Sequence, residues 1–482
     1  MPIAKFVKKL IAHPLIFLPL IFIAAGLFGG CASNMERYYS DLRAKLEARD
    51  YSQAADFVER SRGKYGSKNI LLFYYDSGFV NHLAENNGLS FRRFETAKVI
   101  YNDNFTRSIS AGVASMFLND NAIPYYGLPF ERAHVSVFQA LNLLTSGQDI
   151  EATVEARQTD TLFRILSFTG DFYNEDAFIR YFMGMVFENA GEFNDARVSY
   201  TRAITAYEMG FVGLEPPRDL INDAYTLSLR VGFPERAQQI KARYPFATRT
   251  EIPAGFGECV IVNYNGFIPE KVEQSFEFAL FDLWPYVGAT PPANSREERD
   301  MQRAKSITIA AFANDFVRIA FPVNRRIPNA ITTFAVTTST GAVFRADKVQ
   351  DIAVISDKVL QDNIGKIRAK TFARAAIRYV LGKTTSRAVR NSTNNDGLGA
   401  LTQIAFNIFS AAVETADTRG WNTLPEEINI SRFYLPAGNN RVIVSFLDRR
   451  GRIVEERVVN INIREGRKNF VYLRSSFTPA GR

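Results

Sequence analysis

The hydrophobic periodicity of this 482-residue chain changes near residue 250. Residues 35–248 lack strand-like alternation and are rich in Ala, Leu, Phe and Tyr, which predicts helices. After residues 253–255 (Pro-Ala-Gly), β-rich runs appear at 258–263, 316–321 and 332–338. We therefore expect an α+β protein in which an all-helical part precedes a mixed part.

The helical half contains a candidate repeat unit at residues 176–206. A first helix would carry Met183, Gly184 and Phe187, a turn would fall at 191–193, and a second helix would carry Ala196, Tyr200 and Ala203. Small residues at Gly184 and Ala196 would let the helices approach, while Phe187 and Tyr200 would fill the gap between successive hairpins. This pattern resembles a tetratricopeptide unit.

Weaker copies of the unit occur at residues 49–54, 147–152 and 232–237. We expect about four or five helix pairs, stacked as a tetratricopeptide-like (TPR-like) solenoid over residues 31–248. Arrays of this kind present a concave face to peptides or proteins, so the helical repeats predict a protein partner. The alternative is that the array is only a structural spacer.

The mixed half covers residues 250–482. We expect one or two helices over 347–382, a polar flexible loop near 386–399 and an apolar, buried helix over 400–416. Strands follow at 441–447, 452–463 and 469–473, joined by short turns. The sequence therefore predicts an antiparallel sheet that ends in a C-terminal β-meander.

The N-terminus has the pattern of an export signal. Lys5, Lys8 and Lys9 precede an apolar run that ends at Gly29-Gly30-Cys31. The run resembles the lipobox of bacterial lipoproteins, although Phe28 stands where the family pattern has Leu. The resemblance implies cleavage of residues 1–30 and acylation of Cys31; three acyl chains would supply roughly 30 kcal/mol of membrane affinity. An uncleaved transmembrane anchor is the alternative.

Ala32, the residue after the cysteine, is not an acid. In enterobacteria-like sorting this favours the outer membrane, with the protein facing the periplasm. Cys31 and Cys259 are the two cysteines, so after acylation one thiol remains and no internal disulfide is expected. The net charge of +8 is mildly basic and does not by itself argue for nucleic acid, which we do not expect as a partner.

Motifs that carry catalysis are not evident in the sequence. Gly382-Lys383-Thr384 lacks the first glycine of a Walker A loop, because Ile377 stands in its place. His82 and His134 lie far apart, and no Cys/His cluster has zinc spacing. We expect no catalytic, cofactor or metal site. Carboxylates occur throughout the chain and no particular pair is indicated, so the sequence does not support a glycosidase but does not exclude one.

One basic segment is distinctive. Lys366, Lys370, Arg374 and Arg378 step by four residues and would form a stripe along one helix face. The stripe could be a solvated surface, or it could contact anionic lipid, an acidic envelope polymer or an acidic protein. Like charges four residues apart repel one another, and an anionic partner would relieve that cost.

Five segments of the chain are distinctive when taken together: the lipobox at Cys31 and residues 126–132, 154–157, 417–425 and 435–438. Together they resemble a family of poorly characterised bacterial lipoproteins with tetratricopeptide-like repeats. Members are often encoded beside lipoproteins that activate penicillin-binding proteins, which implies a role in cell-envelope or peptidoglycan assembly. The resemblance transfers no catalytic residue.

Within residues 417–425, we interpret Asp417, Arg419 and Trp421 as structural, with Trp421 anchoring the join between helices and sheet; a ligand site is the alternative. The main functional hypothesis is a membrane-anchored, non-enzymatic scaffold or adaptor. The alternative is an envelope enzyme or a polysaccharide- or peptidoglycan-binding protein with its site in the mixed half. A cleft lined by close carboxylates in that half would favour the alternative.

Overall fold

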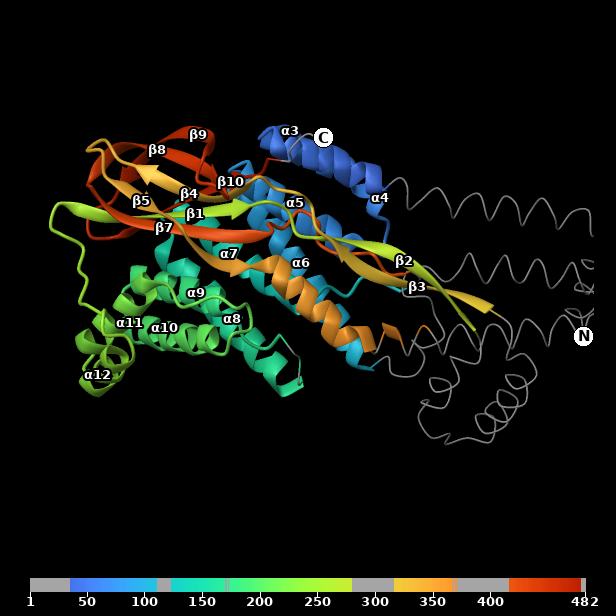
Figure 1. The fold of residues 1–482 in the computed structure, drawn as a ribbon, viewed down its shortest axis with the longest axis horizontal. Helices are drawn as coiled ribbons and strands as arrows, with labels where there is room; N and C mark the ends of the chain where they lie inside the picture. Colours follow the sequence, from blue (N-terminus) through green and yellow to red (C-terminus); the bar gives the residue numbers. More distant parts are fainter. Residues whose placement is uncertain are drawn as a thin grey trace, which may run out of the picture.

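The computed structural model describes residues 35–110, 123–169, 171, 173–279, 316–365, 367–368, 371 and 416–477 (Figure 1). The helical half is a series of consecutive helices. They are residues 35–47, α3 (Tyr51–Arg60), α4 (Arg62–Tyr65), α5 (Ile70–Leu83), α6 (Asn87–Ser110), α7 (Pro129–Thr145), α8 (Asp149–Thr169), α9 (Ala177–Asn189), α10 (Phe193–Glu208), α11 (Arg218–Arg230) and α12 (Pro234–Arg243).

These helices pack as pairs of chain neighbours. Helix 35–47 pairs with α3 through the stacked rings of Tyr38 and Phe57, and α5–α6, α7–α8, α9–α10 and α11–α12 follow. The described residues thus hold five pairs, which confirms the expectation of four or five. The predicted turns are also present, since Gly147, Gly191 and Gly232 adopt positive φ just before α8, α10 and α12.

The pair α9–α10 shows the close approach that the repeat pattern predicts at Gly184. Tyr200, which was expected to fill the gap between successive hairpins, packs instead against Gly184 within this hairpin. Gly184 of α9 faces the ring of Tyr200 on α10, and a Cβ added at Gly184 would lie 2.4 Å from that ring. Tyr200 is fully buried, and its hydroxyl donates to Glu188 at 2.6 Å. The glycine therefore sets the distance between the two helices.

Replacing Gly184 with alanine is expected to destabilise the protein by about 1–3 kcal/mol, because the new methyl group forces the helices apart. Urea unfolding measures the change. Gly88→Ala is the matched control, since its Cβ would meet only Arg92 at 3.7 Å and alanine favours a helix. Equal unfolding midpoints for the two variants would contradict the proposed packing.

The described residues of the mixed half form ten strands. They are β1 (Phe256–Asn265), β2 (Glu270–Ala279), β3 (Phe316–Arg325), β4 (Ile331–Thr337), β5 (Val343–Arg345), β6 (Asp347–Asp351), β7 (Glu427–Pro436), β8 (Gly438–Asp448), β9 (Ile453–Ile463) and β10 (Lys468–Ser475). One four-stranded sheet, here called the inner sheet, has the order β10-β1-β7-β6. A second, the outer sheet, has the order β5-β4-β8-β9, and β2 pairs with β3 in a separate ribbon. Residues 352–365 are helical.

The two four-stranded sheets share a hydrophobic core. Side chains of β1 and β7, including Ile261 and Phe433, pack with those of β4, β8 and β9, including Phe334, Val444 and Ile461. The opposite face of the inner sheet packs against the helices, so the layers run from helices to inner sheet to outer sheet (Figure 1). The fold class is α+β, as the sequence predicts.

Two parts of the mixed half differ from the expected topology. Residues 347–351 form strand β6 rather than the start of a helix, which begins at residue 352. The C-terminal meander is limited to the β8–β9 hairpin, because β10 crosses to the inner sheet and pairs in parallel with β1. Asn469 stabilises this crossing, since its side-chain amide donates to Arg464 and Arg467 carbonyls and its oxygen accepts from the Arg464 amide.

Candidate functional site

The residues that the sequence singled out for binding lie outside the described residues. They are Cys31, Lys366, Lys370, Arg374 and Arg378, and the loop at 386–399 lies outside as well. The acylation of Cys31 and the anionic contact of the basic stripe therefore remain predictions. The structure instead defines the join between the helices and the inner sheet.

The first helix of each of the last four pairs contacts the inner sheet. On α5, His82 stacks on Tyr472 of β10 with ring centroids 4.0 Å apart. On α7, Phe138 meets Tyr264 of β1, and on α9, Phe182 meets Phe470 of β10. On α11, Asp223 pairs with Arg432 of β7. The chain's own sheet thus occupies this face of the array, so a protein partner would have to use another surface.

Trp421 lies at the centre of the join. Its ring is almost fully buried, stacks on Tyr75 of α5 at 4.5 Å and meets Phe79 and Phe138 edge-on. Its backbone N–H donates to Glu131 of α7 at 2.9 Å, and its Nε1–H donates to Thr423 at 2.8 Å. These contacts confirm that Trp421 anchors the helices to the segment that leads into β7.

Arg419 and Asp417 hold the same segment in place. The Arg419 guanidinium donates to both carboxylate oxygens of Asp417, at 2.8 and 2.7 Å. It also donates to the Ile123 carbonyl at 2.9 Å and lies over the ring of Tyr125. The two side chains bridge residues 417–421 to the chain just before α7, which agrees with their structural interpretation.

Two buried carboxylates flank Trp421. Asp76 of α5 accepts hydrogen bonds from the hydroxyls of Tyr39, Tyr65 and Thr423. Burial raises the pKa of Asp76 to about 6, although these hydrogen bonds act to lower it. Burial also raises the pKa of Glu131, which accepts from Tyr125, the Leu128 N–H and the Trp421 N–H. Hydrogen bonds rather than ion pairs therefore hold both carboxylates.

This environment predicts an unusual acid response. Asp76 has a pKa of about 6 when folded and an ordinary value of 3.8, so its contribution to stability is largest in acid and is lost as pH rises through about 6. His82 has the opposite effect on stability. Burial lowers its pKa to about 4 in the folded protein, so that as pH falls below 6.5 the unfolded chain binds a proton first and the folded state loses stability.

The melting temperature of Asp76→Asn should therefore fall further between pH 7 and pH 5 than that of the unmodified protein, because the variant lacks the stabilisation that Asp76 gains in acid. Differential scanning fluorimetry measures the difference. The exposed Asp56→Asn is the control, and identical pH profiles for both variants would contradict the assignment.

A second buried network contains four charged groups. Arg432 of β7 donates to Asp223 of α11 and to Glu258 of β1, both at 2.6 Å, and Lys468 of β10 donates to Glu258 at 2.6 Å. Burial would raise the pKa of Glu258, but Arg432 and Lys468 lower it to about 2. This network was not predicted from the sequence. A signal was present, because Arg432 follows Ile428 and Ile430 on one face of the strand, where an inward charge needs a partner.

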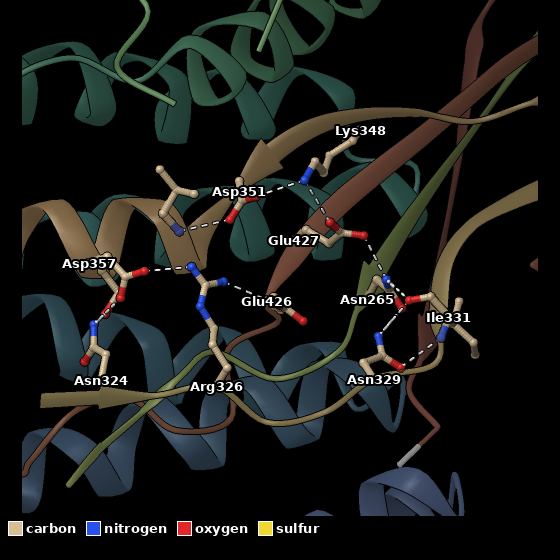
Figure 2. Close-up of polar contacts among 12 residues, drawn as sticks. Asn265, Asn324, Arg326, Asn329, Ile331, Lys348, Asp351, Asp357, Glu426 and Glu427 are labelled. Atoms are coloured by element: carbon tan, nitrogen blue, oxygen red, sulfur yellow. Dashed lines mark hydrogen bonds and ion pairs between the residues drawn. The ribbon is translucent and has the colours of Figure 1, made fainter. Parts of the chain in front are cut away.

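Figure 2 shows a third polar cluster, formed by residues of β6, the start of β7 and the segments that follow β3 and β6. Lys348 lies between Asp351 and Glu427, at 2.9 and 3.2 Å. Arg326 lies between Asp357 and Glu426, at 2.6 and 3.2 Å. Each of these carboxylates has a cation partner, so the cluster does not form the open carboxylate pair that would favour a glycosidase.

Other side chains with reactive or metal-binding chemistry are held in the core. His82 bonds Asn142 and Tyr264, and His134 bonds the Phe130 carbonyl. Cys259 is buried between the sheets, and burial raises the pKa of its thiol. Within the described part of the chain, no group of three or more His, Cys, Asp or Glu side chains could hold a metal ion. In the same residues, no helix has the length and hydropathy needed to cross a bilayer.

Comparisons with known proteins add little to this description. No family model and no curated protein matches the chain. Among solved structures, it is similar to RapI, with 11% identity and a TM-score of 0.33, over 43% of this chain and 52% of that one. YrrB, described as a TPR protein with an unusual peptide-binding site, is 14% identical with a TM-score of 0.28, over 45% and 93%. MamA from Desulfovibrio magneticus RS-1 is 10% identical with a TM-score of 0.27, over 43% and 91%.

The match to RapI spans about half of that protein's length. TM-scores at this level carry no argument about what the chain binds. The TPR-like character of the helical half rests on its own packing, in which Gly184 meets Tyr200 and five helix pairs follow one another.

Proposed function

We propose that this protein is an envelope lipoprotein, acylated at Cys31, that acts as a non-enzymatic protein-binding scaffold. The lipobox supports export and anchoring, and Ala32 favours the outer membrane with the body facing the periplasm. The family resemblance of residues 126–132 and 417–425 supports a role in cell-envelope or peptidoglycan assembly. The basic stripe from Lys366 to Arg378 is a proposed second contact, with anionic lipid or an envelope polymer.

The observation that supports the scaffold role is the hydrophobic core that the helices share with the inner sheet. Trp421, Arg432 and Lys468 join segments far apart in the sequence through buried contacts. A partner bound to either half would thus be held by one packed body. Because Met35 follows Cys31 by four positions, an acylated Cys31 would keep helix 35–47 within about 14 Å of the anchor.

Replacing Cys31 with serine is expected to abolish acylation, because the hydroxyl replaces the thiol that would carry the acyl chains. Intact mass spectrometry should show the loss of the acyl mass, with Cys259→Ala as the control that keeps it. If the purified native protein retained residues 1–30 and an unmodified Cys31, the anchoring proposal would fail.

Crosslinking in whole cells tests the scaffold role itself. Photo-crosslinkers placed at exposed positions of both halves, such as Val154 on α8 and Val458 on β9, should yield adducts with a recurring envelope protein. Loss of those adducts in Cys31→Ser would show that the anchor brings the partner within reach. A chain that gives no protein adduct from either half would not be a scaffold.

A further inference from the structure

The outer face of the outer sheet carries a row of exposed aliphatic side chains. The strand register places Val343, Thr337, Ile443 and Val458 side by side across β5, β4, β8 and β9. Val343 is 60% exposed, Ile443 41% and Val458 50%. The inward residues of the same strands, such as Val444 and Ile461, fill the core between the sheets. The row is thus an apolar strip on the face turned away from the helices.

Arginines border this strip on both sides. Arg345 lies two residues beyond Val343 on β5, and Arg441 lies two residues before Ile443 on β8. Both side chains are exposed, as are Arg449 and Arg450 in the turn after β8. Within the described residues, none of these four arginines forms an ion pair. The strip is therefore set in a surface with available positive charge.

Two acidic side chains near the strip accept hydrogen bonds from the chain itself, although Glu456 remains exposed and keeps its charge. Glu456, in the row next to the strip, accepts a hydrogen bond from Ser445 at 2.7 Å. Asp448 accepts from Arg452 at 2.8 Å and from the backbone N–H groups of Arg450 and Arg452. Among the side chains named around the strip, exposed arginines thus outnumber exposed carboxylates. The forked guanidinium binds carboxylates and phosphates through paired hydrogen bonds, and carboxylates are the anionic groups that an unmodified protein segment offers.

The position of the face distinguishes a protein from a membrane as its partner. The start of helix 35–47 lies near the base of the β2–β3 ribbon, where Glu36 is 3.8 Å from Arg325. In Figure 1 that ribbon extends to the right, whereas β5, β8 and β9 lie at the left end. An anchor on the chain before residue 35 would therefore hold the bilayer at the end opposite the outer sheet.

We propose that this face binds an acidic protein segment whose aliphatic side chains cover the strip while its carboxylates pair with Arg345 and Arg441. The inference rests on the proposed scaffold function and deepens it, because it names the surface and the chemistry of the partner. Burial of Val343, Ile443 and Val458 would provide affinity, and the arginines would select against neutral or basic segments.

Photo-crosslinking of the full chain in cells tests the proposal. A benzoylphenylalanine at Ile443 or Val458 reports on the strip, and the same residue at Val154 on α8 reports on a distant surface. The charge-reversed variant Arg345→Glu with Arg441→Glu is compared with Arg345→Lys with Arg441→Lys. Circular dichroism checks that each variant is folded.

Adducts from positions 443 and 458 should map to a segment of net negative charge. Their yield should fall at least about tenfold on charge reversal and should fall less for the lysine pair, which keeps the positive charge but loses the guanidinium fork. A tenfold change in affinity corresponds to ~1.4 kcal/mol. A neutral or basic segment, an unchanged yield, or adducts only with lipid or peptidoglycan would overturn the proposal. Adducts at Val154 alone would overturn it and leave the scaffold function standing, whereas no protein adduct at any position would remove both.

Discussion

Replacing Trp421 with alanine is expected to lower the free energy of unfolding by about 3–5 kcal/mol. The substitution removes a buried ring that touches Tyr75, Phe79 and Phe138, and it leaves a cavity between the helices and the segment before β7. It also removes the Nε1–H bond to Thr423, one of the three hydroxyls that bond Asp76. Urea unfolding followed by circular dichroism measures the loss.

Trp421→Phe is the matched variant for this prediction. Phenylalanine keeps most of the stacking on Tyr75 but cannot donate to Thr423, so its loss should be smaller, about 1–3 kcal/mol. The contrast separates the packing of the ring from its hydrogen bond. If the alanine variant lost less than about 1 kcal/mol, Trp421 would not anchor the join.

Replacing Arg432 with methionine is expected to cost about 3–5 kcal/mol at pH 7, because Asp223 and Glu258 would remain buried without their guanidinium partner. The loss should shrink as pH falls. In the unmodified protein Arg432 and Lys468 hold the pKa of Glu258 at about 2, and without Arg432 its burial would raise that pKa. A carboxylate that takes up a proton at mildly acidic pH no longer leaves a buried charge unpaired.

Arg452→Met provides the control for Arg432. Arg452 is largely exposed and pairs with Asp448 at the surface, so its loss should cost less than about 1 kcal/mol and should not depend strongly on pH. Urea unfolding at pH 7 and pH 4.5 gives both comparisons. Similar losses for the two variants, or a loss in Arg432→Met that grows in acid, would contradict the buried network.

Local sequence patterns account for the elements that depend on nearby residues. The unit at 176–206 predicted α9, the turn at Gly191 and α10, because the spacing of Gly184 and Tyr200 reflects contacts within one hairpin. The strands β1, β3, β4, β8 and β9 were also predicted from nearby residues, because each contains a run with β-branched side chains. Strands β2, β6 and β7 were not predicted, because their charged residues interrupt the apolar pattern.

Long-range pairing could not be read from the sequence. A short turn such as residues 464–467 is compatible with a hairpin and also with a connection between two sheets. The chain connects two sheets here, because β10 pairs with β1 and contacts α9. Trp421 was predicted to anchor the join between helices and sheet, with Pro425 ending the segment before the strands. The partners of Arg432 were not predictable, since Asp223 and Glu258 are distant in sequence and meet it only in the folded chain.

Amide hydrogen exchange on the unmodified protein tests most directly whether helices and inner sheet form one body. The shared core predicts that α5, α7 and α9 open together with β1 and β10, at one free energy, and that Arg432→Met lowers all of them by a similar amount. The account would be contradicted if the amides of these helices opened at free energies several kcal/mol lower than those of β1 and β10, and if Arg432→Met changed the opening of the helices alone or of the strands alone.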